Sequence, residues 1–581
     1  MGVPAFVSVK AILVTSVLVA GAYLYNKLYY RRFRQNAHLP QLPSSLLWGH
    51  LLLFHKFTKQ GAPDRHPGNP AAEMHEKLGR PPIMLLDNWP IVPPMVIVAN
   101  HEVAEQISRP SADFPYSAMK SPSVDRIVDL IGPNSILFKQ NERWKAVRKR
   151  FNPGFAPQHL MTLLPVILEK AQTYVKILDH FAESGESFAL DQHTTNLTFD
   201  IIGIVTMGED MNAQHVDPTQ QGELIKRFKE LIKTYADDKL QLPWWLMPRT
   251  HLRRRQIGRQ ITERLKAIIS RNFETTKAEL NTGRPRSILA LSLQDVEKLT
   301  PDILAETCDQ LKTFLFAGHD TTSSLICWTV YELSRTPHVL KAVRDELERL
   351  LGYETIQDPA AIQQKLLGPG CDEIIHQMTY ISAVLKEVLR VYAPAGSIRM
   401  AKPNTGVVVS TSQGEYNLDG NWIYLNQYIM HRDRAVYGDT ADDFVPERWL
   451  ESDGFPPSAW RPFERGPRNC IGLELANIEA RAIIALIAHR YAFEKVGIVQ
   501  LPVMGKPSSK FVPKLKLFSH VTTCKALFVC SSVKPGLLAG SNFHAEPSYP
   551  ISGHNTTSDW AIKFYLLARK SPASRVASTA R

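Results

Sequence analysis

One long helical pattern in the centre of the sequence limits the possible folds more than any other feature. Thr300 is a typical helix N-cap residue, and Pro301 after it suits the first helical turn. The helical pattern then continues to Thr336, which precedes a proline. A helix of roughly 35 residues is about 50 Å long at 1.5 Å per residue. It would cross a whole domain, so we expect the rest of the chain to pack around it.

The fold class follows from the segments on either side. Residues 157–183, 259–280 and 479–493 have apolar residues at the spacing of amphipathic helices. Short strand-like pieces such as "MVIVAN", "TGVVVS" and "NWIYLN" are a minority. The chain is 44% apolar and 21% charged, and no long linker or internal repeat interrupts residues 51–520. We therefore predict a mainly α fold with small β-sheets in one large domain over 51–520.

The N-terminus has the composition of a membrane anchor. Residues 3–25 are almost wholly apolar, and Lys27, Arg31, Arg32 and Arg34 follow at once. About 20 apolar residues span a bilayer, and clustered positive charge stays on the cytoplasmic side. We predict an anchor over residues 1–30, a basic and proline-containing hinge over 31–50, and a cytosolic domain held at the endoplasmic reticulum membrane. A cleaved signal peptide is the alternative.

The net charge limits the classes of binding partner, and the cysteine content limits the cellular compartment. The net charge of +12 is compatible with nucleic acid, anionic lipid or an acidic protein. No nucleic-acid motif is present, which leaves a membrane or an acidic partner. The six cysteines lack the spacing of a disulfide framework or a zinc site, which favours a reducing compartment.

The stretch "FAGHDTTSS", residues 316–324, breaks the rules of an interior helix. Glycine, aspartate and hydroxyl side chains are poor helix formers because they add entropy or compete for the backbone. Such a run is either an ordinary polar stripe or a local distortion that serves function. The helix sequence alone does not decide between the two.

Three further motifs follow in order. Glu387 and Arg390 are three residues apart and share one helical face. Arg448 comes next, in "FVPERWL", and could form a buried network with Glu387. The last motif is "FERGPRNCIG", in which Cys470 is either a small buried hydrophobe or a thiolate held for a metal.

Taken together, the Asp-Thr-Thr run, the Glu-x-x-Arg pair, the Pro-Glu-Arg step and the cysteine motif resemble the cytochrome P450 family over roughly residues 40 to 500. The cysteine motif matches at all of its defining positions. The hinge "LPQLPSSLLWGH" and the segment "AWRPFERGPRNCIG" further resemble fungal P450 monooxygenases of polyketide and mycotoxin pathways, including enzymes that act on anthraquinones and xanthones.

The resemblance implies haem b as cofactor, with Cys470 as the axial thiolate that donates electron density to iron. Phe463 would shield the thiolate, Gly466 would allow a tight turn, and Gly472 would let the backbone approach the porphyrin. Arg468 would pair with a haem propionate.

The same resemblance implies roles for residues elsewhere in the chain. Trp144, Arg148 and Arg399 are expected to bind the propionates. Glu387, Arg390 and Arg448 are expected to form a structural network that supports the cysteine loop, without a catalytic role.

Oxygen chemistry would depend on the long helix. Thr321 would hold oxygen and a water molecule, and Asp320 would relay protons. The implied reaction is a monooxygenation of an apolar small molecule, with electrons from NADPH through a membrane-bound reductase. A basic surface that includes Arg143 and Lys145 would suit an acidic docking face on that reductase. "LPWWLMPRTHLRRR", residues 242–255, would either dip into lipid or pack in the core.

Two alternatives remain open. The first is a P450-type ring-forming or rearrangement enzyme, and the second is an inactive haem-binding protein. The second arises because residues 521–581 depart from the family pattern: they form an atypical basic tail, which we predict to be disordered.

Overall fold

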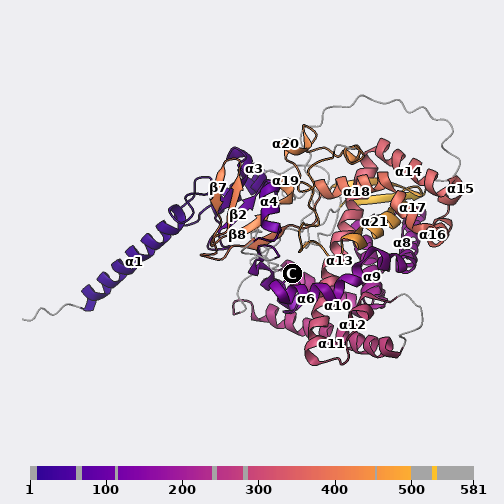
Figure 1. The fold of residues 1–581 in the computed structure, drawn as a ribbon, viewed down its shortest axis with the longest axis horizontal. Helices are drawn as coiled ribbons and strands as arrows, with labels where there is room; N and C mark the ends of the chain where they lie inside the picture. The colour runs from indigo at the N-terminus through magenta and orange to yellow at the C-terminus, as the bar shows by residue number, and fades with distance from the viewer. Residues whose placement is uncertain are drawn as a thin grey trace, which may run out of the picture. The chain divides into compact units, whose positions relative to one another are not determined.

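The computed structural model describes residues 9–60, 68–111, 116–237, 245–278, 286–451, 454–498 and 526–532. They fall into two compact units. Unit 1 holds the described residues of 1–123 and 389–470, and unit 2 holds the described residues of 124–388 and 471–532. Both units have more helix than strand (Figure 1), which confirms the predicted mainly α class with small sheets.

Unit 1 is built around a five-stranded sheet with the order β1-β2-β8-β5-β3. Its strands are β1 (Ile83–Leu86), β2 (Met95–Val98), β3 (Met119–Lys120), β5 (Ser397–Met400) and β8 (Trp422–Leu425). β2 and β8 run parallel, and the other neighbours are antiparallel. Residues such as Val96 and Ile423 are fully buried in the core that this sheet forms. The sheet thus joins two segments that lie more than three hundred residues apart in the sequence.

Short elements complete unit 1. A hairpin is formed by β6 (Val408–Thr411) and β7 (Gly414–Asn417). The helices are α2 (Leu51–Lys59), α3 (Gly68–Lys77), α4 (His101–Ser108), α19 (Gln427–Met430), α20 (Arg434–Tyr437) and the 3₁₀ turn η4 (Pro446–Trp449).

The N-terminal helix α1 (Val9–Phe33) extends beyond the predicted anchor. Its part Ile12–Phe33 is long and apolar enough to cross a membrane. Its last turn is nevertheless tied to unit 1, because the buried Arg32 guanidinium pairs with Asp87 at 2.5 Å and donates to the Trp89 carbonyl at 2.7 Å. Leu42 is also buried. The basic segment 31–50 is therefore packed structure where the sequence predicted a hinge.

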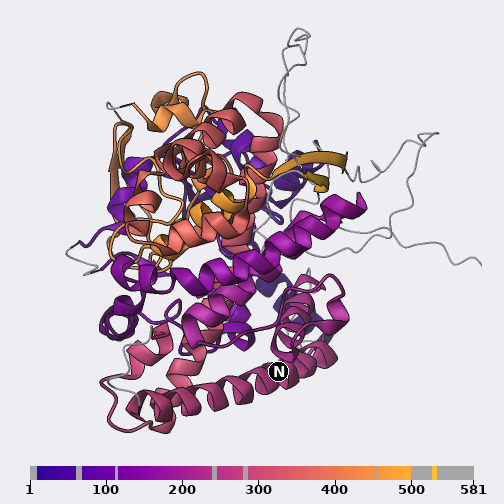
Figure 2. The same cartoon turned by 90° about the vertical axis from the view of Figure 1, so that its right-hand side faces the viewer.

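Unit 2 is helical around α13 (Pro301–Arg335), which packs most extensively against α9 (Leu190–Met207). Thr300 caps α13, and its hydroxyl accepts the Ile303 N–H at 3.3 Å. The predicted 35-residue helix and its N-cap are confirmed. Figure 2 shows the long helices of this unit from the side.

The remaining helical elements assigned to unit 2 or crossing its boundary are η1 (Pro122–Ile127), α5 (Val128–Ile131), α6 (Asn141–Phe151), η2 (Asn152–Phe155), α7 (Pro157–Thr162), α8 (Leu164–Ser184), η3 (Pro218–Gln220), α10 (Glu223–Asp237), α11 (Pro248–Ala278), α12 (Ile288–Leu293), α14 (Pro337–Leu351), α15 (Tyr353–Ile356), α16 (Pro359–Leu367), α17 (Cys371–Gln377), α18 (Thr379–Val391) and α21 (Leu473–Ile487).

A small sheet of unit 2 includes part of the atypical C-terminal segment. Strand β10 (Ala526–Ser532) pairs antiparallel with β4 (Ser187–Ala189) and β9 (Tyr491–Ile498). These seven residues are therefore a strand, although the sequence predicted disorder over 521–581. The rest of that predicted tail lies outside the described residues.

Candidate functional site

The loop that carries Cys470 closes on itself within unit 1. The Cys470 N–H donates to the Phe463 carbonyl at 2.8 Å, and the Asn469 N–H donates to Gly466 at 3.2 Å. Gly466 has a φ of 75°, and a Cβ there would lie 2.2 Å from the Ser108 carbonyl oxygen. Only glycine fits both conditions. Cys470 forms no disulfide and is exposed, which favours a reactive thiol over the small buried hydrophobe.

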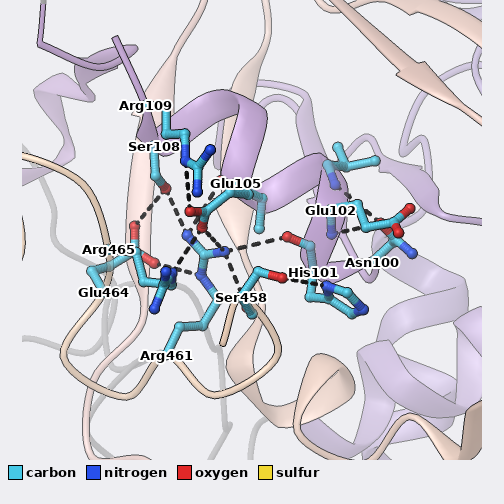
Figure 3. Close-up of polar contacts among 12 residues, drawn as sticks. Asn100, His101, Glu102, Glu105, Ser108, Arg109, Ser458, Arg461, Glu464 and Arg465 are labelled. Atoms are coloured by element: carbon cyan, nitrogen blue, oxygen red, sulfur yellow. Dashed lines mark hydrogen bonds and ion pairs between the residues drawn. The ribbon is translucent and has the colours of Figure 1, made fainter. Parts of the chain in front are cut away.

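Charged side chains anchor the start of this loop to α4 (Figure 3). Arg461 Nε lies 3.0 Å from Glu464 Oε1, and its Nη2 donates to the Ser108 hydroxyl at 2.7 Å. Arg465 Nε lies 3.0 Å from Glu105 Oε2. Asn100 caps α4 and fixes where the helix begins. The loop is thus held from two sides, by its own turn and by α4.

The sequence interpretation missed Arg461 and Glu464. The available signal was the alternation of opposite charges around Phe463, in "RPFER". Both side chains are almost fully buried. Because buried charges require partners, such an alternation inside a predicted turn indicates an internal ion-pair network.

Arg399, predicted as a propionate ligand, lies fully buried on β5. Its Nη2 is 3.4 Å from Glu464 Oε2, and its Nη1 is 3.3 Å from the Ser117 hydroxyl. Its Nε–H has no hydrogen-bond partner among the described residues. A buried guanidinium N–H normally has an acceptor, so this atom fits an acceptor that a bound group would supply.

Lys120 lies directly opposite Arg399 in the β3–β5 ladder. Its Nζ donates to the Ser397 hydroxyl at 2.9 Å. Burial lowers the pKa of Lys120 well below its ordinary value, and repulsion from Arg399 and Arg468 lowers it further. Cys470 and Glu464 oppose this lowering. Repulsion of this kind is relieved when an anion binds among the cations.

These side chains fit a haem. In the described part of unit 1, Lys120 interacts electrostatically with Arg399, with Arg468 and with Cys470. The two carboxylates of a haem would satisfy such cations with charge-assisted hydrogen bonds, and the Cys470 thiolate would be its iron ligand. Lys120 was not predicted from the sequence, because only strand pairing brings it opposite Arg399.

The two arginines of the expected support network donate hydrogen bonds to backbone carbonyls. Arg390 donates to the carbonyls of His431 at 2.6 Å and Asp443 at 2.7 Å. Arg448 donates to the Thr440 carbonyl at 2.9 Å. Glu387 is fully buried on α18. Both arginines thus bind the segment between His431 and Asp443. Their predicted support of the cysteine loop together with Glu387 stays a prediction.

The polar run of unit 2 remains a continuous helix in the centre of α13. Residues 307–315 and 322–333 are buried, whereas Ala317 is exposed and Thr321 is half-buried. The Thr321 hydroxyl donates to the Ala317 carbonyl at 2.7 Å, and Asp320 is buried. Thr321 therefore lies at a partly accessible position between two buried stretches of the helix.

Part of the run has a packing explanation instead. A Cβ on Gly318 would lie 2.8 Å from Ile202 of α9. The Ser323 hydroxyl accepts from Thr195 at 3.1 Å. Gly318 and Ser323 thus allow α9 and α13 to approach and contact each other, whereas the chemical role of Asp320 and Thr321 stays a prediction.

The predicted pair Trp144 and Arg148 lies on α6, where Trp144 is buried and Arg148 Nε donates to Asn152 Oδ1 at 2.7 Å. Gly472 precedes α21 as its N-cap, so the chain enters that helix directly after the cysteine loop. Units 1 and 2 each hold part of the predicted site: Cys470, Phe463, Gly466, Arg468 and Arg399 in unit 1, and Trp144, Arg148, Asp320, Thr321 and Gly472 in unit 2.

Comparison with known proteins decides the family. The cytochrome P450 family model matches residues 40–518. The chain belongs to the cytochrome P450 family. It is 32% identical over 435 residues to cytochrome P450 monooxygenase acrF of Aspergillus aculeatus, which covers 70% of this chain and 84% of that protein. It is also 27% identical to cytochrome P450 monooxygenase polC of Polytolypa hystricis, covering 81% and 85% of the two chains.

Solved P450 structures confirm the fold. The crystal structure of a cytochrome P450 (CYP102L1) aligns with a TM-score of 0.62 at 19% identity, covering 79% of this chain and 98% of that chain. The cytochrome P450DA haem domain aligns with a TM-score of 0.64, also at 19% identity, covering 86% and 98%. This P450 is thus a monooxygenase of a haem-binding family, and two of its relatives are fungal monooxygenases.

Proposed function

We propose that this P450 is a membrane-anchored haem-thiolate monooxygenase that oxidises an apolar intermediate of fungal secondary metabolism, derived from a polyketide. The observation that carries the proposal is the loop of Cys470, an exposed cysteine outside any disulfide. Its unit also holds the buried Arg399, whose Nε–H has no hydrogen-bond partner among the described residues. The two fungal monooxygenases among its relatives support the fungal assignment.

Each part of the site has a task in this reaction. Haem bound through Cys470 supplies the activation of dioxygen. Arg399, Arg468 and Lys120 would hold the haem carboxylates, with help from Trp144 and Arg148. Gly466 and the Arg461–Glu464 pair hold the loop in shape. Thr321 would position water and oxygen, and Asp320 would deliver protons.

Electrons would come from NADPH through a cytochrome P450 reductase. Arg143 and Lys149 on α6 are exposed and suit an acidic docking face. Trp245 and Leu246, 62% and 52% exposed, precede α11 and support an additional contact with lipid. With α1 as a single span, the enzyme would lie on the cytosolic face of the endoplasmic reticulum.

The difference spectrum of the reduced, carbon-monoxide-bound protein in membranes tests the proposal. A strongly red-shifted Soret band that is absent from Cys470→Ala is the expected result. Substrate conversion is then followed as NADPH consumption coupled to product in the presence of reductase. A wild-type protein that expresses but shows no such band would exclude the haem-thiolate assignment.

A further inference from the structure

His319, the residue before Asp320, makes two polar contacts in the centre of α13. Its Nδ1 lies 2.6 Å from the Leu315 carbonyl oxygen. Its Nε2 lies 3.3 Å from Asp320 Oδ2. The side chains of His319 and Asp320 are only 5% and 11% exposed. The two side chains therefore form a buried pair, which we call the His–Asp pair.

The contact of Nδ1 with the Leu315 carbonyl determines whether Nε2 can donate to Asp320 or only accept. A carbonyl oxygen can only accept a hydrogen bond, so Nδ1 must carry a hydrogen. In a neutral ring Nε2 is then an acceptor, and it faces a carboxylate oxygen that is also an acceptor. Two acceptors repel each other at this separation unless a proton lies between them. The His–Asp pair consequently holds one exchangeable proton, on Nε2 or on Oδ2.

The surroundings keep the imidazole in place. The rings of Phe199 and Phe228 meet it edge-on, with centroids 5.4 and 5.8 Å away. The Thr198 hydroxyl donates to the His319 carbonyl at 2.6 Å. Apolar edges on two sides leave the ring few polar alternatives, so its proton is directed toward Asp320.

Other titratable groups on the helices packed against this turn are His193 and Asp200 of α9 and Lys229 of α10. The Lys229 ammonium donates to Asn196 Oδ1 at 2.7 Å and to Gln221 Oε1 at 3.1 Å, and it interacts electrostatically with Asp320. Burial raises the pKa of Asp200 to about 6 and lowers that of His193 to about 4. Burial lowers the pKa of Lys229 to about 8, so near neutral pH it is still mostly charged, and its charge offsets that of Asp200 first and that of Asp320 second.

We propose that His319 is a positioning residue that keeps Asp320 supplied with a proton at neutral pH, an assignment that rests on the monooxygenase function proposed above. In the transfer step the Nε2–H bond breaks and the Oδ2–H bond forms, and no electron moves. Asp320 then passes the proton to the reacting oxygen. The His–Asp pair, left with one negative charge near Lys229, regains a proton from water.

The pair improves on a lone aspartate for a physical reason. An isolated aspartic acid is protonated in only about one molecule in a thousand at pH 7. Imidazole exchanges its proton near neutral pH. Sharing a proton with imidazole therefore keeps a proton available at this position at a pH where a lone carboxylate would be deprotonated.

The test compares His319→Gln and His319→Asn with the matched control His193→Gln, a buried histidine on the neighbouring helix. Each variant is assayed with reductase for NADPH oxidation and hydrogen peroxide release across pH. Glutamine can still donate a hydrogen bond to Asp320, but its amide has no proton that it can give up near neutral pH. Both His319 variants are expected to lose several-fold in NADPH oxidation at neutral pH, and the pH at which activity falls should move down by at least about one unit.

The carbon-monoxide spectrum separates the two proposals. A wild-type protein without the thiolate band would contradict the proposed function. His319 variants that show this band and the wild-type pH profile would contradict the role of His319. A His193→Gln variant with the same pH shift would also overturn it. If no His319 variant retains the band, neutron diffraction on the wild-type holoprotein is used to locate the proton of the His–Asp pair. Deuterons on Nδ1 and between Nε2 and Oδ2 support the proposal, and an empty Nε2–Oδ2 gap contradicts it.

Discussion

Arg399 has a buried guanidinium with two weak protein contacts and one N–H without an acceptor. A side chain in this state is poised to bind an anion, because the desolvation of its charge has already occurred. Glu464 keeps it in place before the anion arrives. The structure thereby gives a physical basis for a ligand role that the sequence implied only through resemblance.

Replacing Arg399 with Met should weaken the binding of haem. The loss of a charge-assisted hydrogen bond of about 1.5–3 kcal/mol corresponds to a haem affinity that is roughly ten- to a hundred-fold weaker, and haem should dissociate correspondingly faster. The rate of haem transfer to an apo-acceptor measures this. Lys402→Met, which removes an exposed cation close in sequence, serves as the control, and equal rates for the two variants would contradict the role.

His431 links pH to stability. It is fully buried; its Nδ1–H donates to the Arg390 carbonyl and its Nε2 accepts from the Arg461 N–H, both at 3.1 Å. Burial first, and then the charge of Arg390, lower the pKa of His431 to about 3. The folded protein therefore keeps this ring neutral down to about pH 3, whereas the unfolded chain protonates it below about pH 6.5.

We therefore expect stability to fall as pH decreases from about 6.5 toward 3, by up to about 1.4 kcal/mol per pH unit from this group. His431→Gln should be less stable at pH 7 but should lose less on acidification. Urea unfolding at pH 7.5 and 5.5 gives the comparison. The exposed His338 provides the control, since His338→Gln should keep the wild-type dependence, and an unchanged dependence in His431→Gln would refute the prediction.

At the scale of elements, α6 has two different faces. Arg143 and Lys149 are exposed. Arg150 instead points to α13, where it pairs with Glu306 at 3.4 Å and donates to the Thr307 hydroxyl at 3.1 Å. The basic run on this helix therefore divides into cations available to a partner and one that joins two helices.

Charge reversal should separate these faces. Arg143→Glu or Lys149→Glu should raise the KM for reductase several-fold, most strongly at low salt, with little change in thermal stability. Arg150→Glu should lower the Tm because it repels Glu306. Titration with reductase and thermal unfolding measure the two effects. A KM that is insensitive to both exposed substitutions would place the docking surface elsewhere.

At the scale of the whole molecule, the apolar helix α1 continues into the packed structure of unit 1. Arg32 is buried at the end of α1, and its partner Asp87 follows β1. Removing one partner of a buried ion pair costs about 3–5 kcal/mol, because the other charge is left uncompensated. At least one cation of the basic cluster after the apolar run, Arg32, therefore serves the stability of unit 1.

Truncation makes this measurable. A chain that begins at Lys27 should leave the membrane fraction more readily and keep its Tm. Arg32→Ala in that background should lower the Tm by several degrees, whereas Arg34→Ala, an exposed neighbour, should not. Equal Tm values for the two alanine variants would show that the buried pair contributes no stability.

The sequence by itself determined the features that depend on local order. The 35-residue helix, its Thr300 cap, the apolar N-terminal segment and the cysteine motif are all encoded by neighbouring residues. Periodicity and capping are local properties, so they can be predicted without knowledge of distant contacts.

Only the tertiary structure decided which charges are internal. Lys120 meets Arg399 because β3 pairs with β5, and Arg461 meets Ser108 because the cysteine loop packs on α4. Arg32 likewise pairs with Asp87 across a stretch of more than fifty residues. In the sequence, Lys120, Arg461 and Arg32 resemble solvated surface charges. The difference arises from burial, which requires a partner for every charge and is set by contacts between distant segments.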